Sequence, residues 1–183
     1  MEQQLIERLK KIKLLITDLD GVHTDGSFYV SGFGEFKRFH ASDGAAVVLA
    51  RHAELPIAII SGRASLATQQ RIKDLQIPED LVFEGYMNKT IPYELLLKKF
   101  NVTDDEVAYV GDDFIDEPIL KRVGAAFSVP NARKEIRDIC HYVTHAEGGK
   151  GAVREIIELI LTIQGRFQPS LDKMRTLYIR DES

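Results

Sequence analysis

The sequence has few of the features that mark secreted or membrane proteins. Cys140 is its only cysteine, so no disulfide can form within the chain. Five charged residues fall among the first eleven, which is unlike a secretory signal, and we expect the protein in the cytoplasm. Apolar stretches such as residues 55–60 are far shorter than the ~20 residues that a membrane helix needs. The sequence therefore predicts neither a disulfide framework nor a membrane span.

An excess of positive charge is also missing. The chain carries 24 Lys and Arg against 28 Asp and Glu, a formal net charge of −4 at pH 7. No broad basic field is available to hold nucleic acid or an anionic membrane, so we expect neither as a partner. An anionic ligand would have to be bound locally, by a few residues.

The length and composition fit one globular domain, with 183 residues of which 44% are hydrophobic. We assign this domain to residues 1–165. Hydrophobic periodicity fades after Gly165, and residues 166–183 mix Pro169 with charges and isolated apolar residues. We therefore expect residues 166–183 to form a C-terminal tail that is mobile, or ordered only against a partner.

Buried-strand patterns alternate with helical patterns along the chain. The strand patterns lie at residues 12–17, 57–60, 81–83, 107–110 and 125–129, and the helical patterns at 45–53, 66–75, 92–100, 116–123 and 152–164. The first two strands are nearly continuous apolar runs with β-branched residues, which is typical of parallel strands covered on both faces. The alternation predicts an α/β fold with a doubly wound, mostly parallel, Rossmann-like sheet. Such sheets bind ligands outside the carboxyl ends of their strands.

A projecting β-hairpin is predicted at about residues 24–39, where two aromatic-rich segments flank Ser31-Gly32-Phe33-Gly34. Ser42 and Asp43 are expected to cap the helix that follows. Only the hairpin and one helix fit between Asp20 and Ser61, so the spacing leaves no room for a cap domain over the site.

Acidic residues follow two of the strongest strand patterns. Asp18 and Asp20 come at the end of the first strand, and Asp112 and Asp113 come after residues 107–110, with Asp116 three positions further on. If these strands are neighbours, their carboxylates converge at one sheet edge and repel. A hard divalent cation relieves such repulsion, and Mg²⁺ is the usual one beside a phosphate.

Phosphate chemistry is favoured by three further residues at strand ends. Ser61 offers a hydroxyl, Gly62 lets backbone amides approach a ligand, and Lys89 can balance a phosphate dianion. The Asp-x-Asp spacing suits a carboxylate that attacks phosphorus and a second acid that protonates the leaving oxygen.

These motifs, in this order, resemble the haloacid dehalogenase superfamily of phosphohydrolases. The matching segments are Asp18-Leu19-Asp20-Gly21-Val22, Ile60-Ser61-Gly62-Arg63, Asn88-Lys89 and Gly111-Asp112-Asp113. Over about residues 12–165 the chain is most similar to a capless group within it, the 3-deoxy-D-manno-octulosonate 8-phosphate phosphatases, including Gly148-Gly149-Lys150-Gly151.

The resemblance implies roles for the motif residues. It implies Asp18 as nucleophile, Asp20 as acid and base, and Mg²⁺ held by Asp18, the Asp20 backbone carbonyl and Asp112. It also implies Ser61, Gly62 and Lys89 on the phosphate. Asp113 and Asp116 are expected to orient these groups, and Asp116 is equally expected to cap a helix.

The same resemblance implies partners. Capless members assemble as homotetramers in which the hairpins form a barrel and a neighbour closes each site. The residues implied to contact the sugar acid are His40, Ala41, Ser42, Asp43, Gly44, Arg63 and Arg71. The fork of Arg63 suits a substrate carboxylate.

Alternatives remain open. The family usually has Asn at position 40 and an apolar residue at 23, where this chain has histidines, and Ser42 is closer to relatives that act on nine-carbon keto-sugar acid 9-phosphates. Arg63 favours the eight-carbon acid. A receiver-like phospho-aspartate signalling domain is a further alternative, although its acidic pair comes first in the chain. A silent scaffold has no use for both Asp18 and Asp20.

Overall fold

A six-stranded parallel sheet forms the centre of the computed structural model. The structure describes residues 3–32 and 34–180, so Phe33 of the predicted hairpin and residues 181–183 of the predicted tail lie outside it. The strands are β1 (Leu14–Thr17), β4 (Ile57–Ser61), β5 (Val82–Glu84), β6 (Val107–Val110), β7 (Ala125–Ser128) and β8 (Tyr142–Val143). Their order is β5-β4-β1-β6-β7-β8, and every neighbouring pair is parallel. The predicted α/β fold is confirmed.

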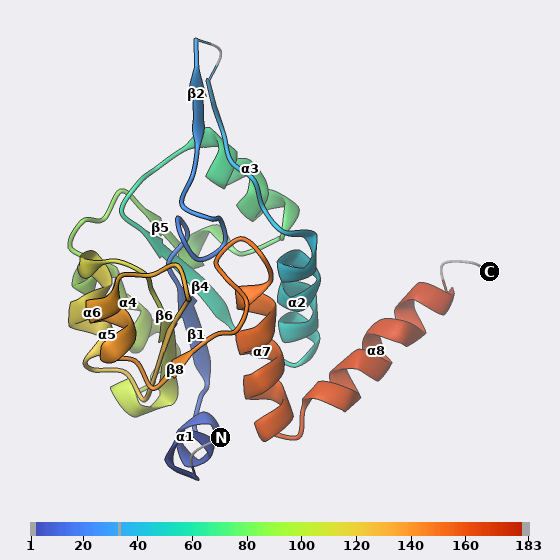
Figure 1. Cartoon of the computed structure of the whole chain (residues 1–183). Helices are drawn as coiled ribbons and strands as arrows, with labels where there is room; N and C mark the ends of the chain where they lie inside the picture. The colour runs from blue at the N-terminus through green and yellow to red at the C-terminus, as the bar shows by residue number, and fades with distance from the viewer. Residues whose placement is uncertain (1–2, 33, 181–183) are drawn as a thin grey trace.

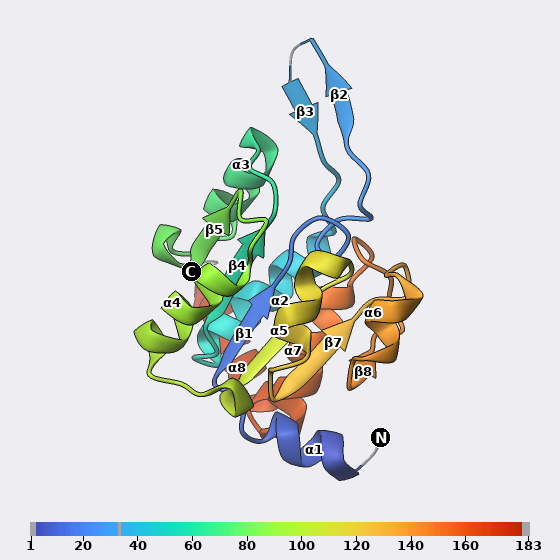
Figure 2. The same cartoon turned by 90° about the vertical axis from the view of Figure 1, so that its left-hand side faces the viewer.

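Helices cover both faces of this sheet (Figures 1 and 2). The helices on one face are α2 (Ala41–His52), α3 (Leu66–Asp74) and α7 (Ala152–Ile163), and those on the other are α4 (Thr90–Phe100), α5 (Glu117–Leu120) and α6 (Lys134–Asp138). The inner stripe of α7 is fully buried at Val153, Ile156, Ile157, Ile160 and Leu161. Among the described residues, no helix is long and apolar enough to cross a bilayer.

Three short elements were not predicted. Helix α1 (Gln3–Leu9) has 7 residues, α6 has 5 and β8 has 2. The two helices span two turns at most and the strand has only two residues, so their hydrophobic periodicity is too weak to detect in the sequence. Helix α1 is held by Leu5 and Leu9, which are buried in the core.

The two central strands carry the site. Strands β1 and β6 are fully buried and pair in register, with Thr17 opposite Val110. The chain leaves both strands at the same edge, and the Asp18 amide still donates to the Val110 carbonyl at 2.9 Å. The predicted convergence of the two acidic segments follows directly from this register.

The hairpin projects well beyond the rest of the molecule (Figures 1 and 2). It consists of β2 (Tyr29–Ser31) and β3 (Gly34–Phe36), paired antiparallel with Tyr29 opposite Phe36. Tyr29, Val30 and Phe36 are exposed. In the described residues between β1 and β4, the regular elements are this hairpin and α2, in keeping with the expected absence of a cap domain.

The C-terminal segment differs from the sequence expectation. Residues 167–180 form helix α8 (Phe167–Arg180), which packs on this chain's own core through Phe167, Leu171 and Met174. These three residues have i, i+4, i+7 spacing, which is a helical stripe too short to stand out in the sequence. Pro169 is tolerated because it lies in the first turn, where its missing amide hydrogen has no intrahelical partner to lose.

Candidate active site

Three carboxylates meet where β1 and β6 end. Asp18 follows β1, Asp112 follows β6, and Asp116 ends the short 3₁₀ turn Phe114–Asp116. One oxygen from each of the three lies within 4.8 Å of the others. All the donors are carboxylate oxygens, the ligands that a hard divalent cation such as Mg²⁺ prefers. The residues present therefore fit a divalent metal, as the sequence predicted.

Lys89 lies inside this cluster. Its ammonium group is 2.5 Å from Asp18 Oδ1 and 2.7 Å from Asp116 Oδ1, and its side chain is fully buried. Burial alone would lower the pKa of Lys89, but the Asp18 and Asp116 carboxylates outweigh burial and raise it. Lys89 therefore stays charged and holds the two carboxylates together. It reaches the site from the residue just before α4.

The carboxylates are not fully neutralised by this lysine. Burial raises the pKa of Asp18 well above its usual range, and the Asp116 charge adds to the effect while Lys89 opposes it. Burial and then Asp116 raise the pKa of Asp112 to about 7. Of the three carboxylates of this cluster, the Lys89 ammonium pairs with those of Asp18 and Asp116. A second cation in the cluster would relieve the remaining repulsion.

Asp116 is a structural anchor whose oxygens are all engaged. Its Oδ1 accepts from Lys89 and from the Tyr109 hydroxyl at 2.5 Å, and its Oδ2 accepts from the amides of Asp112 at 3.1 Å and Asp113 at 3.3 Å. The predicted helix-capping role is thus realised differently, because the Asp116 side chain caps no amide of α5. It orients Asp112 and Lys89, which leaves the Asp18 and Asp112 oxygens freer to face a metal.

Asp113 points away from the cluster. Its Oδ1 accepts from the Phe114 amide at 2.8 Å and pairs with Arg133 at 3.0 Å, on the exposed side of the loop. It therefore helps to shape the turn that carries Asp112 and Asp116.

Close packing behind the Asp18-Leu19-Asp20-Gly21 turn requires glycine. Gly21 has φ +92°, and a Cβ there would lie 2.0 Å from Asp112 Oδ2. The loop Gly148-Gly149-Lys150-Gly151 packs closely against the same turn, since a Cβ on Gly148 would lie 1.8 Å from the Gly21 carbonyl oxygen. Asn131 joins the two, donating to the Gly21 carbonyl at 2.9 Å and accepting from the Gly148 amide at 2.7 Å. Sequence reasoning missed Asn131 because nothing in its neighbourhood marks it.

Asp20 is held by a lysine that the sequence analysis also missed. Lys37, which follows β3, places its ammonium 2.7 Å from Asp20 Oδ1 and 2.9 Å from Oδ2. The two acids of the Asp-x-Asp motif therefore have different cationic partners, Lys89 for Asp18 and Lys37 for Asp20.

The segment Ile60-Ser61-Gly62-Arg63 lies at the same sheet edge. Ser61 ends β4, the neighbour of β1, and is buried with its hydroxyl accepting from the Arg63 amide at 3.2 Å. A Cβ on Gly62 would lie 3.1 Å from the Ile115 side chain, so the glycine allows a close approach. Arg63 pairs with Glu35 of the hairpin at 2.7 Å, and its guanidinium lies 4.0 Å from the centre of the Phe28 ring.

The segment from His40 to Gly44 forms the N-terminal turn of α2. Ser42 and Asp43 lie inside this turn, so the predicted cap is wrong: His40 is the cap residue and its side chain bonds no helix amide. His40 Nδ1 lies 2.5 Å from Ser42 Oγ. The buried Asp43 instead accepts from the Arg154 amide at 2.9 Å and so caps α7.

Arg71 of α3 joins this segment. Its guanidinium donates to the His40 carbonyl at 3.4 Å, and a Cβ on Gly44 would lie 2.7 Å from its Nη2 atom. Ala41 begins α2 beside them. The predicted sugar-contacting residues thus gather at the N-terminus of α2, apart from Arg63, which lies against the hairpin.

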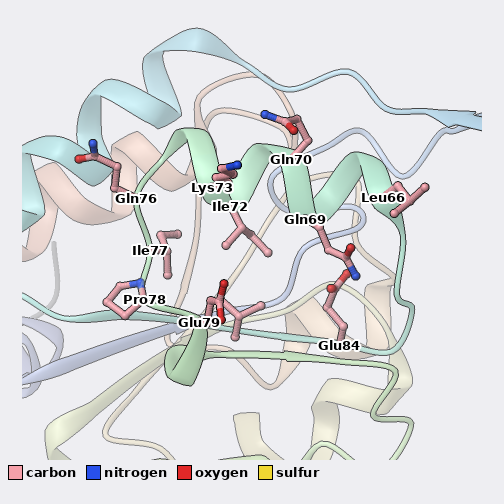
Figure 3. A pocket seen from close by; sticks show the side chains of 11 residues that line it. Leu66, Gln69, Gln70, Ile72, Lys73, Gln76, Ile77, Pro78, Glu79 and Glu84 are labelled. Atoms are coloured by element: carbon pink, nitrogen blue, oxygen red, sulfur yellow. The ribbon is translucent and has the colours of Figure 1, made fainter.

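A groove lies apart from the strand-end cluster (Figure 3). It has a volume of about 820 Å³ and lies between α3 and the edge strand β5, lined by residues such as Gln69, Ile72, Ile77 and Glu84. None of the predicted site residues lines it. Volume alone is therefore no guide to the site in this chain, where chemistry gathers at the strand ends.

Known proteins are similar to this chain in both sequence and fold. A family model of haloacid dehalogenase-like hydrolases matches residues 80–157. The 3-deoxy-D-manno-octulosonate 8-phosphate phosphatase KdsC of Salmonella typhi is 38% identical over 163 residues, covering 88% of this chain and 86% of that protein. The enzyme of that name from Escherichia coli K12 gives the same figures.

Solved structures agree. The crystal structure of the Yersinia pestis 3-deoxy-D-manno-octulosonate 8-phosphate phosphatase superposes with a TM-score of 0.88 at 36% identity, covering 92% of this chain and 90% of that one. The Moraxella catarrhalis phosphatase, in complex with magnesium ion, phosphate ion and KDO, gives 0.89 at 32% identity, covering 95% and 99%. The chain therefore belongs to the haloacid dehalogenase-like hydrolases, in the family of the 3-deoxy-D-manno-octulosonate 8-phosphate phosphatases.

Proposed function

We propose that this protein is a Mg²⁺-dependent phosphatase that hydrolyses 3-deoxy-D-manno-octulosonate 8-phosphate to the free sugar acid and phosphate. The observation that carries the proposal is the cluster of Asp18, Lys89 and Asp112 at one sheet edge, in a chain 38% identical to phosphatases of that name. The receiver-like alternative has no support from the comparisons, since the matching family is one of hydrolases.

The first step transfers the phosphoryl group to the protein. An Asp18 carboxylate oxygen attacks phosphorus, the bond from phosphorus to the sugar oxygen breaks, and Asp20 donates a proton to that oxygen. Ser61 and Lys89 hold the phosphate oxygens, with Gly62 allowing close approach. Asp18, Asp112 and the Asp20 backbone carbonyl would hold Mg²⁺, whose positive charge would offset the repulsion between the carboxylate and the phosphate.

The second step restores the nucleophile. A water molecule attacks the phosphorus of the aspartyl-phosphate, the Asp20 carboxylate accepts its proton, and the bond between phosphorus and the Asp18 oxygen breaks to release phosphate. Asp20 thus alternates between acid and base, and no other proton carrier is required.

The pKa shifts predict how metal and pH act on stability. Because the folded pKa of Asp112 is about 7 and an unfolded aspartate titrates near ~4, stability present at low pH is lost as the pH rises through this window. We expect the metal-free protein to melt at least about 5 °C lower at pH 8 than at pH 5. Mg²⁺ should raise the melting temperature more at pH 8, because it binds ionised carboxylates.

Thermal melts with EDTA and with Mg²⁺ at the two pH values check this expectation. Asp112→Asn serves as the control, since the variant lacks one of the two carboxylates with a raised pKa, and both effects should be smaller in it than in the wild type. A wild-type shift on adding Mg²⁺ that is equal at the two pH values would contradict the carboxylate cluster as the metal site.

The substrate is tested by phosphate release across a panel of esters. We expect the eight-carbon acid phosphate to be preferred over nine-carbon keto-sugar acid phosphates and hexose phosphates, with release lost in EDTA. Preference for a nine-carbon acid is the second candidate, favoured by the resemblance of Ser42 to relatives that act on such acids. No Mg²⁺-dependent release from any ester would overturn the proposed activity.

We further propose a homotetramer built through the hairpin. Tyr29, Val30 and Phe36 are 71%, 74% and 61% exposed on the projecting strands, which supports a surface that a neighbour covers. A neighbouring subunit bound to this surface would enclose the substrate beside Arg63, Arg71 and residues 40–44. A native mass matching the 20.7 kDa single chain would contradict this assembly. The cytoplasmic location stays a prediction.

A further inference from the structure

Lys37 is a buried lysine that both Asp20 oxygens contact. Its side chain has no exposed surface, and its ammonium lies 2.7 Å from Asp20 Oδ1 and 2.9 Å from Oδ2. The same nitrogen donates to the Thr68 hydroxyl of α3 at 3.2 Å. Burying an ammonium group is costly unless it is paired and hydrogen-bonded. The three contacts compensate this cost and hold the lysine in one place.

A chain of charges connects Lys37 to the hairpin. Glu35 Oε1 lies 3.5 Å from the Lys37 ammonium, and Glu35 Oε2 lies 2.7 Å from Arg63, whose guanidinium stacks on Phe28. Asp20 is therefore tied to the hairpin through Lys37, and through Thr68 to α3. The Asp20 carboxylate is thus held by the hairpin segment and α3, which lie outside the turn that carries Asp20.

Fixing the position of the Asp20 carboxyl group affects the rate of the proton transfer proposed for it. A proton donor must lie within hydrogen-bond reach of the leaving oxygen, and a displacement of about 1 Å can cost 10²-fold in rate. Aspartate side chains rotate freely when nothing holds them. With both oxygens on Lys37, the Asp20 carboxylate has a defined direction relative to Asp18, whose own partner is Lys89.

We propose that Lys37 is a positioning residue, which directs the Asp20 carboxyl group toward the leaving oxygen of the substrate. The inference rests on the proposed function, because it takes Asp20 as the acid and base of that reaction. Lys37 itself touches no reacting atom in this assignment.

The test compares two esters that differ in their need for an acid. Alkyl phosphates expel a strongly basic alkoxide that must be protonated, whereas 4-nitrophenyl phosphate expels a stable phenolate that needs little help. We expect Lys37→Met to lower kcat/KM for the sugar phosphate by on the order of 10²-fold, but for 4-nitrophenyl phosphate by less than about 3-fold. Lys37→Arg, which keeps the positive charge, should recover part of the loss.

Two further variants separate positioning from folding. Lys99→Met is the matched control, because Lys99 is exposed, lies outside the site and the hairpin, and pairs with Asp80, so its kcat/KM should equal that of the wild type on both esters. Thr68→Val keeps the Lys37 charge and removes one of its hydrogen bonds, and it should show a smaller loss confined to the sugar phosphate.

Equal losses on both esters for Lys37→Met and Thr68→Val would overturn the proposal, because a general structural defect affects every substrate alike. Full activity of Lys37→Met on the sugar phosphate would also overturn it. The comparison needs only one alkyl and one aryl ester. A wild-type enzyme that prefers another sugar phosphate would therefore contradict the proposed substrate, while losses on that ester still decide the role of Lys37.

Discussion

Replacing Asp18 with asparagine is expected to lower phosphatase turnover by at least on the order of 10³-fold. An amide oxygen is a poor nucleophile toward phosphorus, and the variant also loses a charged metal ligand. Asp18 lies at the end of the fully buried strand β1 and pairs with Lys89. Asp20, the other carboxylate of the turn, is held by Lys37 and does not take its place. Phosphate release under saturating Mg²⁺ measures the effect.

The fold should survive this substitution. Burial raises the pKa of Asp18 well above its usual range, which means that its charge is costly in the folded state, and a neutral amide of the same shape removes that cost. We expect a melting temperature at pH 8 no lower than that of the wild type. Asp25→Asn is the control, since Asp25 is exposed and pairs with Arg38. Retention of more than about a tenth of the wild-type turnover by Asp18→Asn would sink the nucleophile assignment.

Replacing Lys89 with methionine is expected to have the largest effect on stability. The change removes the ammonium shared by Asp18 and Asp116 and leaves buried carboxylates without their partner. Breaking a buried ion pair by removing one member costs about 3–5 kcal/mol. We expect a loss of this size in the free energy of unfolding at pH 8, together with loss of phosphatase activity, measured by denaturant unfolding and phosphate release.

The same variant should behave differently at low pH. Asp18 and Asp112 have raised pKa values in the folded protein, so they take up protons as the pH falls, and the repulsion left by the missing lysine declines. The stability deficit should therefore shrink at pH 5. Lys99→Met provides the comparison, because Lys99 pairs with Asp80 at the exposed surface. A deficit below about 1 kcal/mol at pH 8 would show that Lys89 does not neutralise the cluster.

The hairpin has two roles in this account. Its exposed residues Tyr29, Val30 and Phe36 form the surface proposed for assembly, and Lys37 and Glu35 of the same segment pair with Asp20 and Arg63. A neighbouring subunit that moves the hairpin would therefore also act on the acid of the reaction.

The strands of the sheet and the acids that follow them were predictable from the sequence. Buried apolar runs predicted β1, β4 and β6 to within two residues at each boundary, because a strand covered on both faces leaves a strong local pattern. Once those strands are parallel neighbours, the residues that follow them must meet at one edge. The strand patterns place Asp18 and Asp112 at strand ends, and the pairing of β1 with β6 brings the two together.

The contacts between the side chains of the site could be found only in the tertiary structure. Lys89 and Asp18 are 71 residues apart, and Asn131 and Gly21 are 110 apart, so no local pattern records their contact. The same holds for Lys37, which reads as one charge among many in the hairpin, and for α8, whose helix depends on three side chains that bury against the core. Such contacts depend on how separate elements pack, because a buried charge or apolar group takes whichever partner the fold brings within reach.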